Sequence, residues 1–298
     1  MKKVRTLVFS DLLTIWRNTG LEFSEIILAQ EMMETGRDPV AVKRSLKYLM
    51  DVMLEEAQKN FGKPFKTLTG LTGNNAAKLC ASKPRVLSEF NWVATVTALS
   101  MAESNAAMGR IVACPTAGSC GVMPAMLYAL RNVKEADNEG LLKAFIVASG
   151  VGNVVAKKAT LSGAAGGCQA EIGTATAMAA ALMTYYFSHN PETVGHASAL
   201  ALKSLMGLVC DPVGGFVEVP CVKRNAIAVN VAIACAEMAL AGIESVIPFD
   251  EVVEAMYHVG RSLPESLKET GLGGIAATRT AQKLVESIHK TLNSGSET

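Results

Sequence analysis

The stretch SGAAGGCQAEIGTATAMAAALMTYYF, residues 162–187, decides the fold that the sequence predicts. It opens with a glycine-rich turn that leads to Cys168. The part that follows, residues 169–187, is almost entirely apolar and lacks the polar face that a surface helix carries. We therefore expect a central helix that is buried on every side, with a tight turn in front of it.

Helical signals continue in both directions from this stretch. Apolar residues recur at helical spacing, caps such as Asp38, Ser88 and Asn138 precede them, and strand alternation is almost absent. Further helices are expected near residues 10–20, 24–34, 39–55, 88–108, 138–159, 193–208, 223–241, 250–262 and 280–292. The sequence thus predicts an all-α fold, a single bundle-like domain over residues 1–298 with Gly/Pro-rich turns. A domain boundary near residues 61–85 is a weaker alternative.

The charge balance excludes one class of partner. Lys and Arg number 28 against 27 Asp and Glu, which gives a net charge of +1, and no basic block stands out. Nothing in the sequence therefore attracts nucleic acid, and a small neutral or zwitterionic ligand fits better. Half of the residues are hydrophobic and 14 are methionine, which indicates apolar surface that another chain covers.

Compartment and membrane signals point to the cytoplasm. Seven cysteines are an odd number, so a complete disulfide framework is not expected. The opening MKKVRTLVFSDLL lacks the apolar core and cleavage site of a secretory leader. Residues 111–130 and 172–191 contain no charged side chain, which keeps a membrane protein open as an alternative. Because prolines interrupt the first and the second is strongly apolar over only part of its length, we expect no membrane association.

Cys168, Cys210 and Cys221 lie in Gly- or Pro-rich turns rather than on apolar helical faces. Their spacing matches neither ferredoxins nor paired zinc motifs, so three structural cysteines remain an open alternative. The turns favour a metal site. Residues 211–212 and 214–215 force a turn after one thiol, Pro220 fixes the backbone before another, and residues 166–167 relieve crowding before the third, which gives the clearance that a bulky cluster needs. If three thiolates held a cubane cluster of four irons, one iron would have no protein ligand. Such an open metal position is typical of a Lewis-acid site.

The sequence names no catalytic base. The four histidines lie outside the turns, where surface or capping roles are expected: His189, His196, His258 and His289. Lys157 and Lys158 either face the site or occupy a helix end. Among the other cysteines, Cys80 and Cys235 are interpreted as structural, whereas Cys114 and Cys120 flank a turn near the site.

That turn, ACPTAGSCGVMPA at residues 113–125, combines glycines with the hydroxyls of Thr116 and Ser119 at a helix start. Such a place suits a carboxylate or phosphate, although an ordinary capped helix start explains it as well. The segment FGKPFKTLTGLTGNNAAKL, residues 61–79, is dense in Gly, Thr and Asn, and by itself indicates a surface loop.

Four segments together resemble the alpha chain of iron–sulfur-dependent L-serine dehydratase: PTAGSCG (115–121), SGAAGGCQAEIG (162–173), GLVCDPVGGFVEVPC (207–221) and KRNA (223–226). The resemblance implies a [4Fe-4S] cluster held by Cys168, Cys210 and Cys221 within residues 162–225. It further implies the conversion of L-serine to pyruvate and ammonia without pyridoxal phosphate. Thr116, Gly118 and Ser119 would line the substrate pocket, and residues 69–78 would form a further site loop.

The resemblance is to the two-chain type of this family, because the SSSHT-like motif of the beta portion is absent. A separate beta chain would supply the histidine for proton chemistry, which implies a cytoplasmic hetero-oligomer, at its simplest a heterodimer, in serine catabolism and gluconeogenesis. Two features depart from the family. Cys114 replaces an expected apolar residue, and no cysteine follows Cys235, so the open iron would take water or a partner's group.

Three other functions remain open on the sequence alone. A pyridoxal-phosphate dehydratase would need a Schiff-base lysine and normally an α/β frame. A helical membrane or scaffold protein would explain the apolar helices but not the cysteine turns. A redox iron–sulfur carrier would need a fourth cysteine ligand, which Cys114, Cys120 or Cys235 would have to provide.

Overall fold

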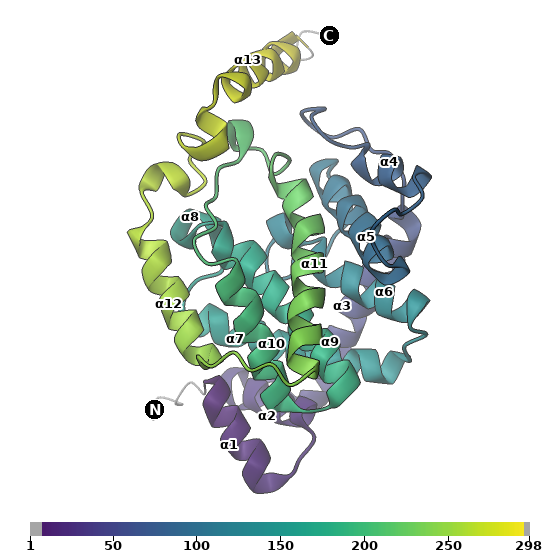
Figure 1. Ribbon diagram of the computed structural model, residues 1–298, viewed down its shortest axis with the longest axis vertical. Helices are drawn as coiled ribbons and strands as arrows, with labels where there is room; N and C mark the ends of the chain where they lie inside the picture. Colours follow the sequence, from purple (N-terminus) through teal and green to yellow (C-terminus); the bar gives the residue numbers. More distant parts are fainter. Residues whose placement is uncertain (1–7, 295–298) are drawn as a thin grey trace.

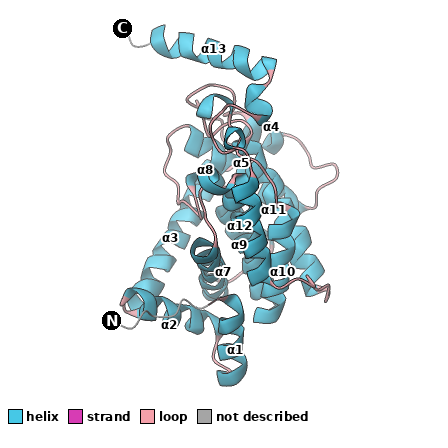
Figure 2. Cartoon of the chain, turned by 90° about the vertical axis from the view of Figure 1, so that its left-hand side faces the viewer, coloured by secondary structure: helices cyan, strands magenta, loops and turns pink. Residues whose placement is uncertain are grey.

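The computed structural model describes residues 8–294, and within this part of the chain every regular element is helical (Figure 2). The all-α prediction is confirmed. The α-helices are α1 Phe9–Thr19, α2 Phe23–Thr35, α3 Pro39–Asn60, α4 Asn75–Ala81, α5 Glu89–Ala106, α6 Val122–Val133, α7 Asn138–Lys158, α8 Gly163–Gly166, α9 Thr174–Ser188, α10 Pro191–Ser204, α11 Cys221–Leu240, α12 Phe249–Ser262 and α13 Arg279–Ser294. Short helical turns are η1 Ala117–Ser119, η2 Gln169–Gly173, η3 Val213–Gly215, η4 Glu265–Leu267 and η5 Gly274–Ala277.

Helix α9 forms the centre of the bundle, as the opening stretch predicts. Every residue from 174 to 185 is buried, and α6, α7, α10 and α11 pack around the helix. The entry to α9 differs from the prediction, because η2 is a π-helical turn rather than the first turn of an α-helix. Such turns are rare in proteins, and those that occur often lie at functional sites.

The helix caps follow local side-chain chemistry. Asp38 accepts a hydrogen bond from the backbone of α3, with Pro39 in the first position, and Ser88 caps α5 in the same way. The prediction for α7 is wrong by one residue. Asp137 accepts from the first-turn amides at 2.8 and 3.0 Å, because its carboxylate reaches them, and Asn138 is the first helical residue.

Other elements also differ from the sequence prediction. Helix α10 ends at Ser204 rather than near residue 208, and α11 begins at Cys221 because Pro220 occupies its N-cap position. Residues 75–81 form α4 inside the segment that by itself indicates a surface loop. The helices on either side of that segment pack together, since α3 contacts both α5 and α6.

Among the described helices, α7 has the length and composition to cross a membrane. It is not one of the two charge-free segments of the sequence, residues 111–130 and 172–191. Two thirds of its most apolar window is buried inside the protein, where α2, α3 and α9 cover it. Helix α7 is therefore placed as a core helix of the bundle.

The turns that carry the cysteines gather at one end of the molecule, the upper end in Figure 1. Helices α9, α10 and α11 run toward this end from the bundle, whereas α1 and α2 lie at the opposite end. Residues 263–278, called the strap below, connect α12 to α13 across the same upper end (Figure 1). The strap pairs with the loop between α10 and α11 through a parallel bridge of Cys210 and Lys268.

Candidate active site

Cys168, Cys210 and Cys221 converge from three separate elements. Cys168 precedes η2, Cys210 lies in the loop after α10, and Cys221 is the first residue of α11. Each is a free thiol and at most 9% exposed. The three are close enough for charges on them to repel one another. The structure thus brings together the residues that the sequence singles out, and their role as ligands stays a prediction.

Burial keeps these thiols protonated in the metal-free chain. It raises the pKa of Cys168 to about 11 and that of Cys221 to about 12, and raises the pKa of Cys210 as well. The nearby guanidinium of Arg224 opposes part of this shift at Cys168 and Cys221. A coordinated thiol loses its proton outright, so a metal group would replace the protons at this place.

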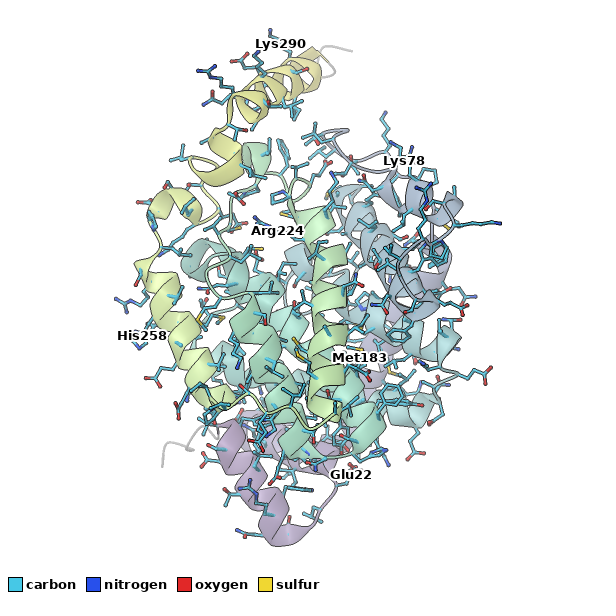
Figure 3. All side chains as sticks on the ribbon, in the orientation of Figure 1. Glu22, Lys78, Met183, Arg224, His258 and Lys290 are labelled. Carbon is cyan, nitrogen blue, oxygen red and sulfur yellow. The ribbon has the colours of Figure 1, made fainter. Side chains whose placement is uncertain are left out.

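Arg224 and Asp211 form a buried ion pair beside the thiols (Figure 3 labels Arg224 near the upper end of α11). The guanidinium donates to Asp211 Oδ1 and to the carbonyl of Val209, each at 2.8 Å, and also interacts with Cys168. Arg224 belongs to the KRNA segment, but its contact with Cys168 could not be predicted from that segment. Only the fold brings the start of α11 to this place.

Glu171 is the second side chain that sequence reasoning missed. Its carboxylate lies between the 115–121 turn and the cysteines: a Cβ added to Gly118 would lie 3.3 Å from Oε1, and one added to Gly163 would lie 2.6 Å from Oε2. Burial raises the pKa of Glu171, against a hydrogen bond from Thr116 that lowers it. The π-helical turn η2, which the sequence did not predict, sets the position of this carboxylate.

The 115–121 turn faces the site with Thr116 and Gly118, which are partly exposed. Ser119 is fully buried, and its hydroxyl lies 3.2 to 3.4 Å from atoms of Thr116 and Cys114. Ser119 therefore stabilises the turn from within. Asn225 of α11 joins the turn to Cys221 by donating to the carbonyls of Gly118 and Cys221, at 2.8 and 3.0 Å.

Residues 69–76 are called the Gly73 loop below. Two buried carboxylates hold this loop. Glu218, three residues before Cys221, accepts from Thr69 N and Thr72 Oγ1 at 2.8 Å. Glu103 of α5 accepts from the amides of Gly73 and Asn75 at 2.8 Å. The loop that the resemblance places at the site is thus attached directly to the segment that carries Cys221.

The remaining candidates lie elsewhere. Lys157 pairs with Glu34 and Lys158 lies 4.0 Å from Asp250, so both occupy a helix end rather than the cysteine site. The histidines hold positions outside it: His189 ends α9, His196 accepts from Ser245 N, and His258 and His289 are exposed on α12 and α13. Cys235 lies in α11 beside Ser204.

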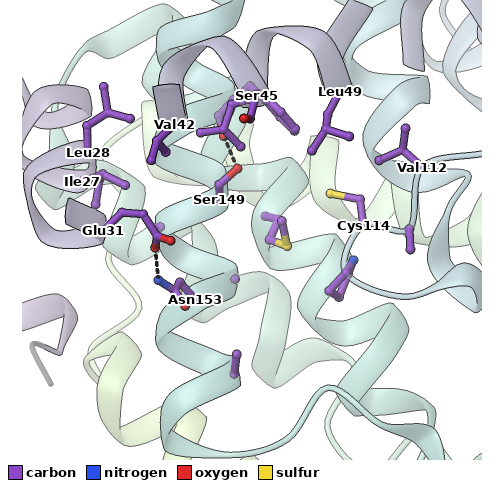
Figure 4. Close-up of a pocket in the computed structure, with 18 of the residues that line it drawn as sticks. Ile27, Leu28, Glu31, Val42, Ser45, Leu49, Val112, Cys114, Ser149 and Asn153 are labelled. Carbon is purple, nitrogen blue, oxygen red and sulfur yellow. Dashed lines mark hydrogen bonds between the residues drawn. The ribbon is translucent and has the colours of Figure 1, made fainter. Parts of the chain in front are cut away.

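Cys114 lines an apolar cavity of about 370 Å³ between α2, α3 and α7, behind the 115–121 turn (Figure 4). Its polar contacts are few, among them a 3.5 Å hydrogen bond from Asn153 to Glu31. Burial raises the pKa of Cys114 to about 12, which keeps it neutral. Cys114 therefore fills the place of the expected apolar residue as a small hydrophobic side chain.

The donors at this place are three thiols, which are not arranged tightly around one point. Within residues 8–294, no three Cys, His, Asp or Glu side chains converge tightly enough to bind one ion directly. A zinc ion bound through sulfur at about 2.3 Å would need sulfurs within about 4.6 Å of one another. Space is kept open at Gly163, where a Cβ would lie 3.0 Å from Cys210 Sγ. That the three thiols beside this space hold a multi-iron group stays a prediction.

Fold and site together define an all-α protein in which three buried thiols lie between glycine-rich turns. The chain matches the family model described as "Serine dehydratase alpha chain" over residues 18–276, and it belongs to that family.

Relatives of two architectures match the chain. A Bacillus subtilis (strain 168) protein named "Probable L-serine dehydratase, alpha chain" is 43% identical over 286 residues, 93% of each chain. The "L-serine dehydratase, alpha chain" of Peptoniphilus asaccharolyticus is 39% identical over 278 residues, 92% of this chain and 95% of the relative. The "L-serine dehydratase" of Streptomyces coelicolor is 33% identical over 273 residues, which cover 89% of this chain but 59% of the relative. The third relative thus has a large part without counterpart here.

Proposed function

We propose that this chain is the alpha subunit of an L-serine dehydratase, a lyase that eliminates water from L-serine to give pyruvate and ammonia in serine catabolism and gluconeogenesis. The names of the alpha-chain relatives support the reaction, and their coverage of this chain supports the subunit. The observation that carries the proposal is the convergence of three buried thiols with the Thr116 turn. In this proposal residues 1–298 act as one catalytic domain in the cytoplasm.

Cys168, Cys210 and Cys221 would hold a [4Fe-4S] cluster, without pyridoxal phosphate. With three protein ligands, the bound cluster supplies an open iron that acts as a Lewis acid toward the departing hydroxyl group of serine. The chain contributes the setting. Burial excludes water from the three sulfurs, and the positive charge of Arg224 offsets part of the negative charge that thiolates bring.

The 115–121 turn would bind the substrate. Thr116 would present its hydroxyl group, and Gly118 its backbone groups, to the carboxylate of the substrate at the start of η1. Ser119 would act from within by fixing the turn. Glu171 offers an anionic oxygen on the cysteine side, suited to the ammonium group of serine. The amino acid would then span the gap between this turn and Cys210, with its hydroxyl group toward the thiol centre.

A separate beta chain would complete the enzyme as a hetero-oligomer. In this proposal the beta chain supplies the base for the α-proton, since none of the histidines in the described part of the chain lies at the thiol site. The match to the Streptomyces coelicolor relative covers 59% of that protein, which leaves a large part of it without counterpart here. Exposed apolar residues on the site's border, Leu68, Leu272 and Ile275, offer surface for such a partner.

Anaerobic purification of the chain, with and without its beta chain, tests the proposal. Iron, acid-labile sulfide and pyruvate formation are measured on both preparations. We expect iron and sulfide in the alpha chain, and pyruvate formation from L-serine when both chains are present. A colourless, iron-free preparation that still forms pyruvate would overturn the cluster assignment. A brown protein that cycles electrons but never forms pyruvate would favour a redox carrier.

A further inference from the structure

Asp211 connects three parts of the upper end through one buried carboxylate. It directly follows Cys210 in the chain and is 2% exposed. Oδ1 accepts from Arg224 Nη2, and Oδ2 accepts from the backbone N–H of Ile275 in the strap, each at 2.8 Å. Neither oxygen is left for a substrate in this arrangement, so Asp211 acts on its neighbours.

The strap is built around this carboxylate. At Gly274 the backbone has φ +59°, and a Cβ there would lie 2.3 Å from Asp211 Oδ2. A side chain at position 274 would therefore displace either the strap or the carboxylate. Two further hydrogen bonds hold the strap to Cys210, which precedes Asp211 in the chain. Cys210 N donates to Leu267 O at 2.9 Å, and Glu269 N donates to Cys210 O at 2.7 Å.

Arg224 extends the connection to a second cysteine. Its guanidinium bonds the carbonyl of Val209 and lies against Cys168. Removing Asp211 would leave this cation buried without its counter-charge, which is costly, and would free it to turn. The carboxylate thus fixes the side chain beside Cys168 and the backbone around Cys210 at the same time.

We propose that Asp211 is a positioning residue that locks the strap and Arg224 together, and so holds Cys168 and Cys210 at the spacing that the metal group requires. The part of the proposal that concerns the metal rests on the proposed function. The part that concerns the strap does not, because its hydrogen bonds join protein groups alone. The two parts can therefore be tested separately.

The first test is hydrogen exchange on the metal-free full-length chain with Asp211→Asn. We expect amide exchange in residues 267–277 to become about tenfold faster, since an amide binds a cation and an N–H more weakly than a carboxylate does. Exchange in α9 should not change. Glu103→Gln is the matched control, because it weakens a buried carboxylate that holds the Gly73 loop. It should accelerate exchange in residues 73–76 and leave the strap unchanged.

The second test measures the release of iron to a chelator from the anaerobically loaded chain. Asp211→Asn should release iron several-fold faster than the wild type. Arg224→Lys keeps the positive charge but loses the two-pronged donor, so its rate of iron release should lie between those of the wild type and Asp211→Asn. Gly274→Ala provides a variant that keeps every charged group. It should repeat both effects, and it keeps the test valid if Asp211→Asn does not fold.

The outcomes separate the parts of the account. Unchanged strap exchange in both Asp211→Asn and Gly274→Ala would overturn the proposal, whether or not the protein binds iron. Faster strap exchange with unchanged iron release would overturn the link to the metal group. If the wild-type chain takes up no iron, the proposed function fails, and the exchange result alone decides whether Asp211 holds the strap.

Discussion

The bundle around α9 and the upper end of the molecule are held together by different interactions. Around α9 the contacts are apolar, and every residue from 174 to 185 is buried. At the upper end, buried polar side chains make the connections: Asp211 holds the strap, Glu218 holds the Gly73 loop, and Gln169 bonds the carbonyls of Gly166 and Met256. Apolar burial is tolerant of small shifts, whereas these hydrogen bonds demand one arrangement.

This difference implies that the two regions fail in different ways. Loss of apolar volume in the bundle should lower the stability of the whole protein without touching the chemistry. Loss of a polar connection at the upper end should disturb the site while the bundle stays folded. The following predictions separate these two behaviours.

The largest effect is expected at the cysteines. Cys221→Ala should reduce pyruvate formation by the two-chain enzyme to background, because the cluster would lose one of its three ligands. Cys235→Ala is the matched control, since Cys235 is also buried in the same helix but lies beside Ser204. It should keep activity within a few-fold of the wild type. Equal losses in both variants would mean that burial, not ligation, explains the effect.

Leu182→Ala tests the bundle. Leu182 is fully buried in α9, and its truncation should lower the free energy of unfolding by about 2–5 kcal/mol. Chemical denaturation followed by circular dichroism measures the change. The iron content per folded chain should stay at the wild-type value. A variant with normal stability but little iron would contradict the separation of the two regions.

Glu218→Gln should release the Gly73 loop. An amide cannot accept both Thr69 N and Thr72 Oγ1 as strongly as the carboxylate does, and we expect a cost of about 1–3 kcal/mol in loop anchoring. The expected readout is a raised KM for L-serine, with the thermal midpoint lowered by only a few degrees. An unchanged KM would show that this loop does not border the substrate.

Alkaline pH should destabilise the metal-free chain through its buried thiols. Burial raises the pKa of Cys114 and Cys120 from 9.0 to about 12. The folded state therefore keeps protons that the unfolded state loses, so stability is full below pH 9 and falls as the pH rises toward 12. Between these pH values the free energy of unfolding falls by up to about 1.4 kcal/mol per pH unit for each thiol. Urea unfolding from pH 8 to 10.5 measures it, and Cys114→Ala should flatten the curve. A flat wild-type curve would contradict the prediction.

The smallest effect concerns the start of α7. Asp137→Ala removes two hydrogen bonds from first-turn amides and should lower the stability of the protein slightly, because those amides lose their side-chain acceptor. Asn138→Ala should be near neutral, since Asn138 lies inside the helix. Neither variant should change iron content, because the cap is remote from the cysteines. A larger loss in Asn138→Ala than in Asp137→Ala would restore the original sequence prediction.

Much of the bundle could be predicted because hydrophobic pattern and caps are local properties. The apolar run before Tyr185 predicts a buried helix, and Asp38 with Pro39 predicts the start of α3. The errors lie where one side chain competes with its neighbour, as at Asp137 and Asn138. They also lie where long-range contacts fix a segment, as Glu103 does for the start of α4.

The site could be predicted only in part. The cysteines were visible because Gly- and Pro-rich turns surround them, and the structure brings them together as expected. Glu171 and Asp211 were missed, although both lie within quoted segments. A π-helical turn aims the first, and a strap more than fifty positions further along the chain engages the second. Neither contact has a local pattern, because tertiary packing creates it.

The most direct test of the central claim is the iron and acid-labile sulfide content of the anaerobically purified chain. The account predicts about four irons and four sulfides per wild-type chain. It also predicts that Cys210→Ala loses them while keeping the helical circular dichroism of the wild type. A Cys210→Ala chain with full iron content and full turnover would contradict the claim that these three thiols form the catalytic centre.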